Sequence, residues 1–165
     1  MKTNKLSGIL IAAVGIAGGW AQSSWVVRET GTSANLWGAA VLQGPAGSLV
    51  PGGRVVVVGE QGTILTSEDG GQSWTRRQSG TLAWLTATYY DSVLRRIFVV
   101  GAGGLILSSV DGLVWTRESS PTTVRLNGIA AGTSGGTLYA VGEPGAGLLL
   151  RDGEGVWIQH DGGFG

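Results

Sequence analysis

Short apolar runs alternate with glycine-rich turns along most of the chain. The run VVVVG at residues 55–59 is followed, after a turn, by TILTS at residues 63–67. The same pair of runs returns as IFVVG with LILSS and as LYAVG with LLL. Short runs of β-branched and other apolar residues bounded by glycine are typical of β-strands and are too short for helices. The pattern therefore predicts an all-β fold.

The runs belong to three tandem copies. Trp74, Trp115 and Trp157 mark a period of 41 to 42 residues. Periods of about 40 residues with β-branched runs and glycine turns are typical of propeller blades, each a four-stranded sheet. We therefore predict a partial β-propeller of four-stranded antiparallel blades, about three blades plus an N-terminal outer strand. The repeats fall at about 33–80, 81–121 and 122–161, within a domain of residues 22–165.

Each copy supplies four strands. The first is LTATYY or LNGIAA, the second VVVVG, the third TILTS, and the fourth begins at the tryptophan. The first strands carry small residues, such as Gly38, Ala87 and Gly128, which suit the crowded centre of a ring. The segment at residues 23–32 matches the fourth strands, so the N-terminus begins with an outer strand. Three blades do not close a ring, since closed propellers have ~4–8. We expect either a longer propeller or several copies that complete one.

The N-terminus has the pattern of a signal peptide. Lys2 and Lys5 precede an apolar core at residues 6–17, and Gly19 and Ala21 occupy small-residue positions before a cleavage site. The core is shorter than the ~20 residues of a membrane span. We therefore expect cleavage near Ala21 and export of residues 22–165 without stable membrane insertion.

Composition excludes several kinds of chemistry. The chain has no cysteine, a single histidine (His160) and 11 basic against 11 acidic residues. The absence of cysteine excludes thiolate chemistry, and a single histidine excludes a multi-histidine metal site. The balanced charge argues against a nucleic-acid binder, which would carry an excess of basic residues. We expect no cofactor, no metal and no nucleic-acid partner.

The turn SEDGGQSW at residues 67–74 recurs in each copy, which favours a structural role. Its serine and aspartate can bond the turn's own backbone, its glycines allow positive φ, and its tryptophan can wedge between blades. The expected structural residues are Ser67, Asp69, Gly71, Trp74, Ser109, Asp111, Trp115, Asp152 and Trp157. The pattern S-x-D-x-G-x-x-W resembles the Asp-box of the bacterial neuraminidase repeat. The longer form is similar to the repeat of propellers related to the photosystem II assembly and stability factor.

Two sets of residues are candidates for partner binding. Asn35, Trp84 and Arg125 occupy equivalent positions just before the first strand of each copy, so we expect them to meet at the mouth of the ring. An aromatic face, a guanidinium and an amide can hold a sugar, a peptide or a carboxylate. Packing of Trp84 between blades is the alternative. The second set is Arg76, Arg77 and Arg117, which follow the tryptophans. The resemblance to the photosystem-related family implies an arginine-rich partner surface, but charges solvated at strand ends are the simpler explanation and the one we favour.

The function favoured by these features is an exported, non-catalytic module that presents a surface to a protein or glycan partner. The Asp-box resemblance also implies a sialidase-like glycoside hydrolase, which needs an arginine cluster, a tyrosine-glutamate pair and an acid/base aspartate. Tyr89, Tyr90 and Tyr139 are present, but no motif joins any of them to a glutamate. A truncated propeller without independent function is the third alternative.

Overall fold

The computed structural model describes residues 8–12, 25–43, 53–132, 136–146, 148–151 and 154–160. Three antiparallel four-stranded sheets follow one another along the chain, each with its strands paired in sequence order. Blade 1 contains β3 (Leu36–Leu42), β4 (Arg54–Gly59), β5 (Ile64–Ser67) and β6 (Thr75–Arg77). Blade 2 contains β7 (Leu85–Asp91), β8 (Arg96–Gly101), β9 (Ile106–Ser109) and β10 (Thr116–Arg117), with a short 3₁₀ turn at Ala102–Gly104. Blade 3 contains β11 (Leu126–Ala131), β12 (Leu138–Gly142), β13 (Leu148–Arg151) and β14 (Trp157–His160).

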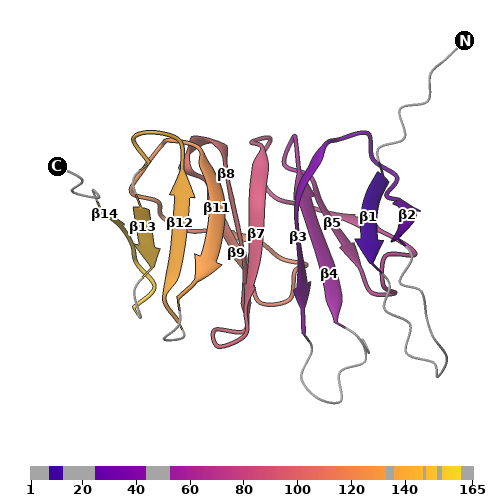
Figure 1. Cartoon of the computed structure of the whole chain (residues 1–165). Coiled ribbons are helices and arrows are strands. Elements are labelled where there is room, and N and C mark those ends of the chain that lie inside the picture. The colour runs from indigo at the N-terminus through magenta and orange to yellow at the C-terminus, as the bar shows by residue number, and fades with distance from the viewer. Residues whose placement is uncertain are drawn as a thin grey trace, which may run out of the picture.

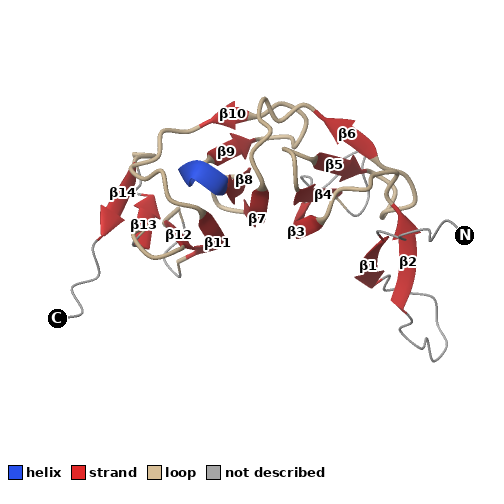
Figure 2. Ribbon diagram, turned by 90° about the horizontal axis from the view of Figure 1, so that it is seen from above, coloured by secondary structure: helices blue, strands red, loops and turns tan. Residues whose placement is uncertain are grey.

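The three blades stand side by side along an open arc (Figures 1 and 2). Seen from above, β3, β7 and β11 line the concave inner side, and β6, β10 and β14 lie on the outer side. This arrangement is that of a partial β-propeller, and it confirms the predicted all-β fold and its four-stranded blades. The fourth strands of blades 1 and 2 begin one residue after the tryptophan, at Thr75 and Thr116, whereas β14 begins at Trp157 itself.

The hydrophobic core lies between the blades. Alternate side chains of a strand point to opposite faces of its sheet, so each central strand contributes to two interfaces. On β8, Ile97 and Val99 pack against blade 1, and Phe98 and Val100 pack against blade 3. All four side chains are 0% exposed. Each blade is therefore buried by its neighbours rather than by a core of its own.

The tryptophans before or at the outer strands extend these interfaces. Trp115 packs on the cluster between blades 1 and 2. Trp157, from blade 3, meets the ring of Phe98 edge-on at 6.4 Å between ring centroids. Its indole nitrogen donates a hydrogen bond of 2.6 Å to Glu118 Oε2, on the segment that leaves blade 2. Trp157 therefore lies between consecutive blades and joins them through an apolar and a polar contact.

The N-terminal end of the arc carries a two-stranded sheet. β2 (Trp25–Glu29), the predicted outer strand, pairs antiparallel with β1 (Gly8–Ala12). β1 falls within the apolar stretch expected to be removed with the signal peptide, while the expected cleavage site near Ala21 lies outside the described residues. In the part of the chain that the structure describes, no helix has the length and apolar character needed to cross a membrane.

Candidate functional site

Asn35, Trp84 and Arg125 occupy one edge of the arc, where the inner strands begin. This is the upper edge of β3 and β11 in Figure 1. The backbone carbonyls of the three residues accept hydrogen bonds from the amides of Glu60 (2.9 Å), Ala102 (2.8 Å) and Glu143 (2.9 Å), respectively. The structure thus places the three predicted residues in equivalent backbone positions, one in each blade.

A glycine at the end of each second strand permits this close approach. A Cβ added to Gly59, Gly101 or Gly142 would lie 2.2, 2.2 or 2.1 Å from the carbonyl oxygen of the residue that precedes the inner strand. Such distances are far inside van der Waals contact, so any side chain here would displace the start of the inner strand. The glycine of each repeated Val-Gly pair therefore fixes where the residue that precedes the inner strand lies against the end of the second strand.

A threonine hydroxyl shapes each loop that leads to the site. Thr32, Thr81 and Thr122 each accept a hydrogen bond from the amide two residues further on, at 3.1, 3.0 and 3.1 Å. Turns of this kind satisfy a loop amide locally and fix the direction of the chain. Because the candidate residue is the third after the threonine in every case, all three begin their strands in the same way.

The side chains form a stack that crosses all three blades. Trp37 and Trp84 are stacked with ring centroids 6.4 Å apart and an interplanar angle of 22°. The Arg125 guanidinium carbon lies 5.6 Å from the centroid of the Trp84 ring. A guanidinium at this distance is attracted to the electron-rich face of an indole. Trp84 of blade 2 is therefore in contact with Trp37 of blade 1 and Arg125 of blade 3.

Trp37 lies at an irregularity of β3 that recurs at the equivalent position of β7 and β11. The pairing of β3 with β4 shifts register between Leu36 and Gly38, so Trp37 lies at a bulge. Bulges re-aim a side chain relative to regular strand alternation. The equivalent residue of blade 2, Thr86, is buried and donates to the carbonyl of Val100 at 3.0 Å. Trp37 was not predicted from sequence; its alignment with Thr86 and Asn127 at the start of an inner strand was the available signal.

Polar groups flank the stack. The Asn35 side-chain nitrogen donates to Glu60 Oε1 at 2.9 Å, and the Asn35 amide donates to Oε2 at 3.2 Å. Arg125 Nη1 lies 3.8 Å from Glu143 Oε1, an ion pair whose glutamate is half exposed and which contributes little to stability. Arg125 Nε is buried without a hydrogen-bond partner among the described residues. The guanidinium is therefore held mainly by its contact with Trp84.

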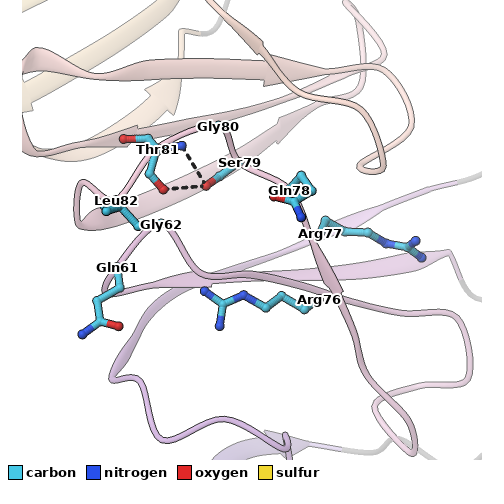
Figure 3. Close-up of a pocket in the computed structure, with 9 residues that line it drawn as sticks. All are labelled: Gln61, Gly62, Arg76, Arg77, Gln78, Ser79, Gly80, Thr81 and Leu82. Atoms are coloured by element: carbon cyan, nitrogen blue, oxygen red, sulfur yellow. Dashed lines mark hydrogen bonds between the residues drawn. The ribbon is translucent and has the colours of Figure 1, made fainter.

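The second candidate set separates in the structure. Arg76 and Arg77 line a pocket of about 410 Å³ bounded by the loop at residues 78–82 and the turn at Gln61–Gly62 (Figure 3). Their side chains point to opposite sides of β6, and Arg77 Nε donates to Thr66 Oγ1 at 2.8 Å. Arg117 is exposed on β10 of the next blade and does not line this pocket. The three arginines therefore do not form one cluster.

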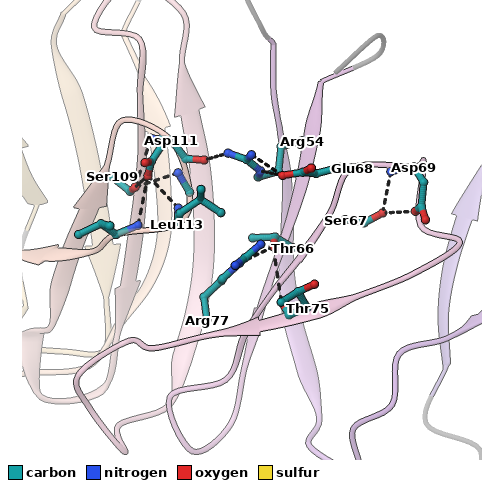
Figure 4. Close-up of polar contacts among 12 residues, drawn as sticks. Arg54, Thr66, Ser67, Glu68, Asp69, Thr75, Arg77, Ser109, Asp111 and Leu113 are labelled. Carbon is teal, nitrogen blue, oxygen red and sulfur yellow. Dashed lines mark hydrogen bonds and ion pairs between the residues drawn. The ribbon is translucent and has the colours of Figure 1, made fainter. Parts of the chain in front are cut away.

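The turn that contains Ser67 and Asp69 is organised by its own hydrogen bonds (Figure 4). Ser67 Oγ donates to Asp69 Oδ1 at 2.7 Å and accepts from the Gly71 amide at 2.8 Å. Gly70 and Gly71 have φ of 72° and 87°, a conformation that strongly favours glycine. Hydrogen bonds from the Ser73 hydroxyl, the Ser73 amide and the Ser67 hydroxyl lower the pKa of Asp69. Every one of these contacts stays within the turn.

The equivalent turn of blade 2 repeats this geometry although it is one residue shorter. The Gly112 amide donates to Ser109 Oγ at 2.8 Å, and the amides of Leu113 and Val114 donate to Asp111 Oδ1 at 2.8 and 3.1 Å. Desolvation by itself raises the pKa of Asp111, but the two amides, the Ser109 hydroxyl and the charge of Arg54 outweigh it, so that the net shift is downward. The expected turn residue of blade 3, Asp152, lies outside the described residues.

Arg54 links the turns of blades 1 and 2. Its Nε donates to Glu68 Oε1 at 3.1 Å, and its Nη1 donates to the carbonyl of Asp111 in the next blade (Figure 4). Trp74, at the end of the first turn, is half-buried, and its ring nitrogen has no hydrogen-bond partner among the described residues. These turns therefore serve the contact between blades, at the edge opposite Trp84.

No group of three or more potential metal-ligating side chains occurs within the described ranges of the chain. Comparison with models of protein families and with curated proteins finds no match to this chain. The most distinctive feature of the candidate site is the stack of Trp37, Trp84 and Arg125.

Proposed function

We propose that this protein is an exported, non-catalytic propeller module that binds a protein or glycan partner through the edge where its inner strands begin. The binding surface, here called the tryptophan rim, consists of Asn35, Trp37, Glu60, Trp84 and Arg125. The observation that carries the proposal is the stacking of two tryptophans and one arginine from three successive blades.

The exposure of the two indoles supports a binding role. Trp37 is 49% and Trp84 43% exposed, whereas Trp157, which joins two blades, is 5% exposed. Tryptophan and arginine are the residues most enriched among those that dominate binding energy at interfaces. The rim holds its indoles against each other before any partner arrives, so that little conformational entropy is lost on binding.

The Ser-Asp turns support a structural role for the motif that resembles the Asp-box. The hydrogen bonds of Ser67 and Asp69 given above are made to their own turn, as expected of a fold-forming element. The resemblance to the photosystem-related propellers is part of this proposal, as is export directed by the basic and apolar N-terminus. Neither resemblance identifies the partner.

Substitutions at the rim test the proposal. The full chain and its Trp84→Ala and Arg125→Ala variants are immobilised and exposed to a glycan array and to proteins extracted from cell envelopes. We expect at least one partner to bind the original chain and to be lost from Trp84→Ala, while Tyr139→Ala, an exposed aromatic of blade 3, binds normally. Partner binding that is unchanged in both rim variants would contradict a role for this surface.

A sialidase-like glycosidase is the second candidate, and the Ser-Asp turn is the observation that favours it. Its catalytic groups would have to meet at one place. Tyr90 instead directs its hydroxyl to the carbonyl of Gln43 at 3.3 Å, at the far end of the inner strands from Arg125. Release of a fluorogenic sialoside by the purified chain would favour hydrolysis, and we expect none.

A further inference from the structure

We propose that the tryptophan rim binds a neutral glycan, with a pyranose ring packed on the exposed face of Trp37. This inference rests on the proposed function, because it assigns a ligand class to the same surface. It follows from three properties of the rim: a flat apolar platform, fixed polar groups beside it and the sign of its local charge.

The platform is a rigid pair of indoles with unequal surroundings. Trp84 is flanked by residues from both neighbouring blades, Trp37 in blade 1 and Arg125 in blade 3. Among the described residues, Trp37 has only Trp84 as an aromatic partner, and about half of its surface is exposed. A pyranose ring has an apolar face of C–H groups that matches a flat indole. Trp37 is therefore the platform, and Trp84 holds it in place.

Asn35, two residues before Trp37 in the chain, and its partner Glu60 have groups that suit sugar hydroxyls. Asn35 and Glu60 hold each other through two hydrogen bonds, at 2.9 and 3.2 Å. Each carboxylate oxygen of Glu60 has a further lone pair, and the Asn35 side chain retains an N–H donor and a carbonyl acceptor. A sugar hydroxyl both donates and accepts, so it can bond this pair without displacing it. Pre-positioned polar groups beside an apolar surface are the common pattern of small-ligand sites.

Charge selects against acidic ligands. The rim and its flank carry two carboxylates, Glu60 and Glu143, and one guanidinium, Arg125, which gives a net charge of −1. Arg125 supplies one positive charge, and Glu143, 3.8 Å from its Nη1, offsets part of it. A sialylated or uronic-acid glycan, or an acidic peptide, would meet unfavourable charge. A neutral glycan meets no such penalty.

The position of the rim favours a narrow ligand over a protein surface. The inner strands line the concave side of the arc (Figure 2), and Trp37 is the second residue of one of them, β3. A single carbohydrate chain fits a concave wall, whereas a protein partner needs about 800 Å² of complementary surface on each side. We therefore favour a glycan chain that runs along the rim from blade 1 toward blade 3.

The test measures binding of defined oligosaccharides to the full chain. Cellohexaose, maltohexaose and N-acetylchitohexaose are titrated by calorimetry and by tryptophan fluorescence, with sialyllactose as the acidic comparison. We expect at least one neutral hexasaccharide to bind at least tenfold more tightly than sialyllactose. Trp37→Ala should weaken that binding at least tenfold, Trp37→Phe should retain part of it, and Tyr139→Ala should leave it unchanged. Unfolding midpoints of all variants establish that each is folded.

The outcomes separate the ligand class from the proposed function. If none of the three neutral hexasaccharides binds at millimolar concentration, or if sialyllactose binds more tightly, the neutral-glycan assignment is overturned. If an envelope protein binds instead and is lost from Trp84→Ala, the binding module stands and only the ligand class is wrong. If a neutral glycan binds equally well to Trp37→Ala, the platform is wrong.

Discussion

Blades 2 and 3 carry nearly the same second strand, yet one face of it is buried in blade 2 and exposed in blade 3. Phe98 and Val100 of β8 are 0% exposed, whereas Tyr139 and Val141 of β12, at the equivalent positions, are 37% and 49% exposed. Phe98 and Val100 are covered by blade 3, through Leu126, Leu149 and other members of the shared cluster. Within the described residues, nothing of comparable size covers Tyr139 and Val141.

This difference shows that burial in the protein is a property of pairs of blades. A repeat of this kind buries its apolar side chains only when a neighbour stacks on it, and its stability is a sum of blade and interface contributions. The same apolar residue therefore has a large effect in one blade and a small effect in the next. Exposed apolar surface of this kind also favours association.

The largest expected effect on stability comes from removing the aromatic ring of Phe98, which blade 3 covers. Removing the ring of Tyr139, at the equivalent but exposed position, is the comparison. Phe98→Ala should destabilise the fold by about 3–5 kcal/mol, because it leaves a cavity between blades 2 and 3. Tyr139→Ala, at the equivalent position, should cost less than about 1 kcal/mol, as is typical of surface changes. Urea denaturation of the two variants checks this. Equal losses of unfolding free energy in the two variants would show that the side chains of Phe98 and Tyr139 are equally buried.

The contacts of Glu118 between blades 2 and 3 are mostly buried, whereas the ion pair of Glu143 with Arg125 is partly exposed. Glu118 accepts from Trp157 Nε1 at 2.6 Å and lies 3.4 Å from Arg151 Nε, and both charged side chains of this pair are 13% exposed. Glu118→Ala should cost about 2–3 kcal/mol, since it leaves buried donors unpaired. Glu143→Ala breaks an exposed pair and should cost less than about 1 kcal/mol. Thermal unfolding at neutral pH measures both, and an equally small loss in each would contradict the role given to Glu118.

The two Ser-Asp turns provide a pH-dependent comparison. The pKa values of Asp69 and Asp111 are lowered in the folded protein, so each carboxylate stabilises the fold above the unfolded pKa of ~4 and loses this effect as pH falls below it. Asp69→Asn and Asp111→Asn should therefore lower the unfolding midpoint at pH 7 and have progressively less effect toward pH 2. Asp111→Asn also loses attraction to Arg54, so its effect at pH 7 should weaken more with added salt. A midpoint difference independent of pH would contradict the lowered pKa values.

The smallest expected effect on stability is at the open face. Val141→Thr keeps the shape of the side chain and places a hydroxyl where water reaches it, so stability should change by less than about 0.5 kcal/mol. Val100→Thr buries the same hydroxyl and should cost about 1–3 kcal/mol. Light scattering should show less self-association of Val141→Thr than of the original chain. Unchanged association would show that this face is not the one through which copies meet.

Strand content and blade order followed from sequence because the chain repeats its own pattern. Glycines at Gly59, Gly101 and Gly142 and threonines at Thr81 and Thr122 recur in step, so equivalent positions could be aligned without a structure. The position of the rim followed for the same reason. Local, repeated chemistry is what a single sequence shows most clearly.

The features that the sequence did not predict depend on contacts between different blades. The stack of Trp37 on Trp84 joins side chains of two different blades, and the register shift at Trp37 recurs in all three blades, so it does not single Trp37 out. The link from Arg54 to the Asp111 carbonyl joins residues far apart in the chain. Arg76 and Arg117 each lie two residues after a tryptophan, but Arg76 lines a pocket together with Arg77, whereas Arg117 does not line it. Repetition predicts equivalent backbone positions, and side-chain neighbours follow only from the assembled blades.

Hydrogen exchange of the full chain, read by mass spectrometry, tests most directly the claim that each blade is stabilised by the next. β8 and β12 are both central strands, paired on each side within their own sheets. We expect slow exchange in β8, close to the rate of global unfolding, and exchange in β12 that is faster by at least tenfold, because β8 is covered on both faces whereas Tyr139 and Val141 leave one face of β12 exposed. Equal protection of β8 and β12 would contradict stabilisation of each blade by the next, since it would show that the face of blade 3 with Tyr139 and Val141 is covered as fully as the matching face of blade 2.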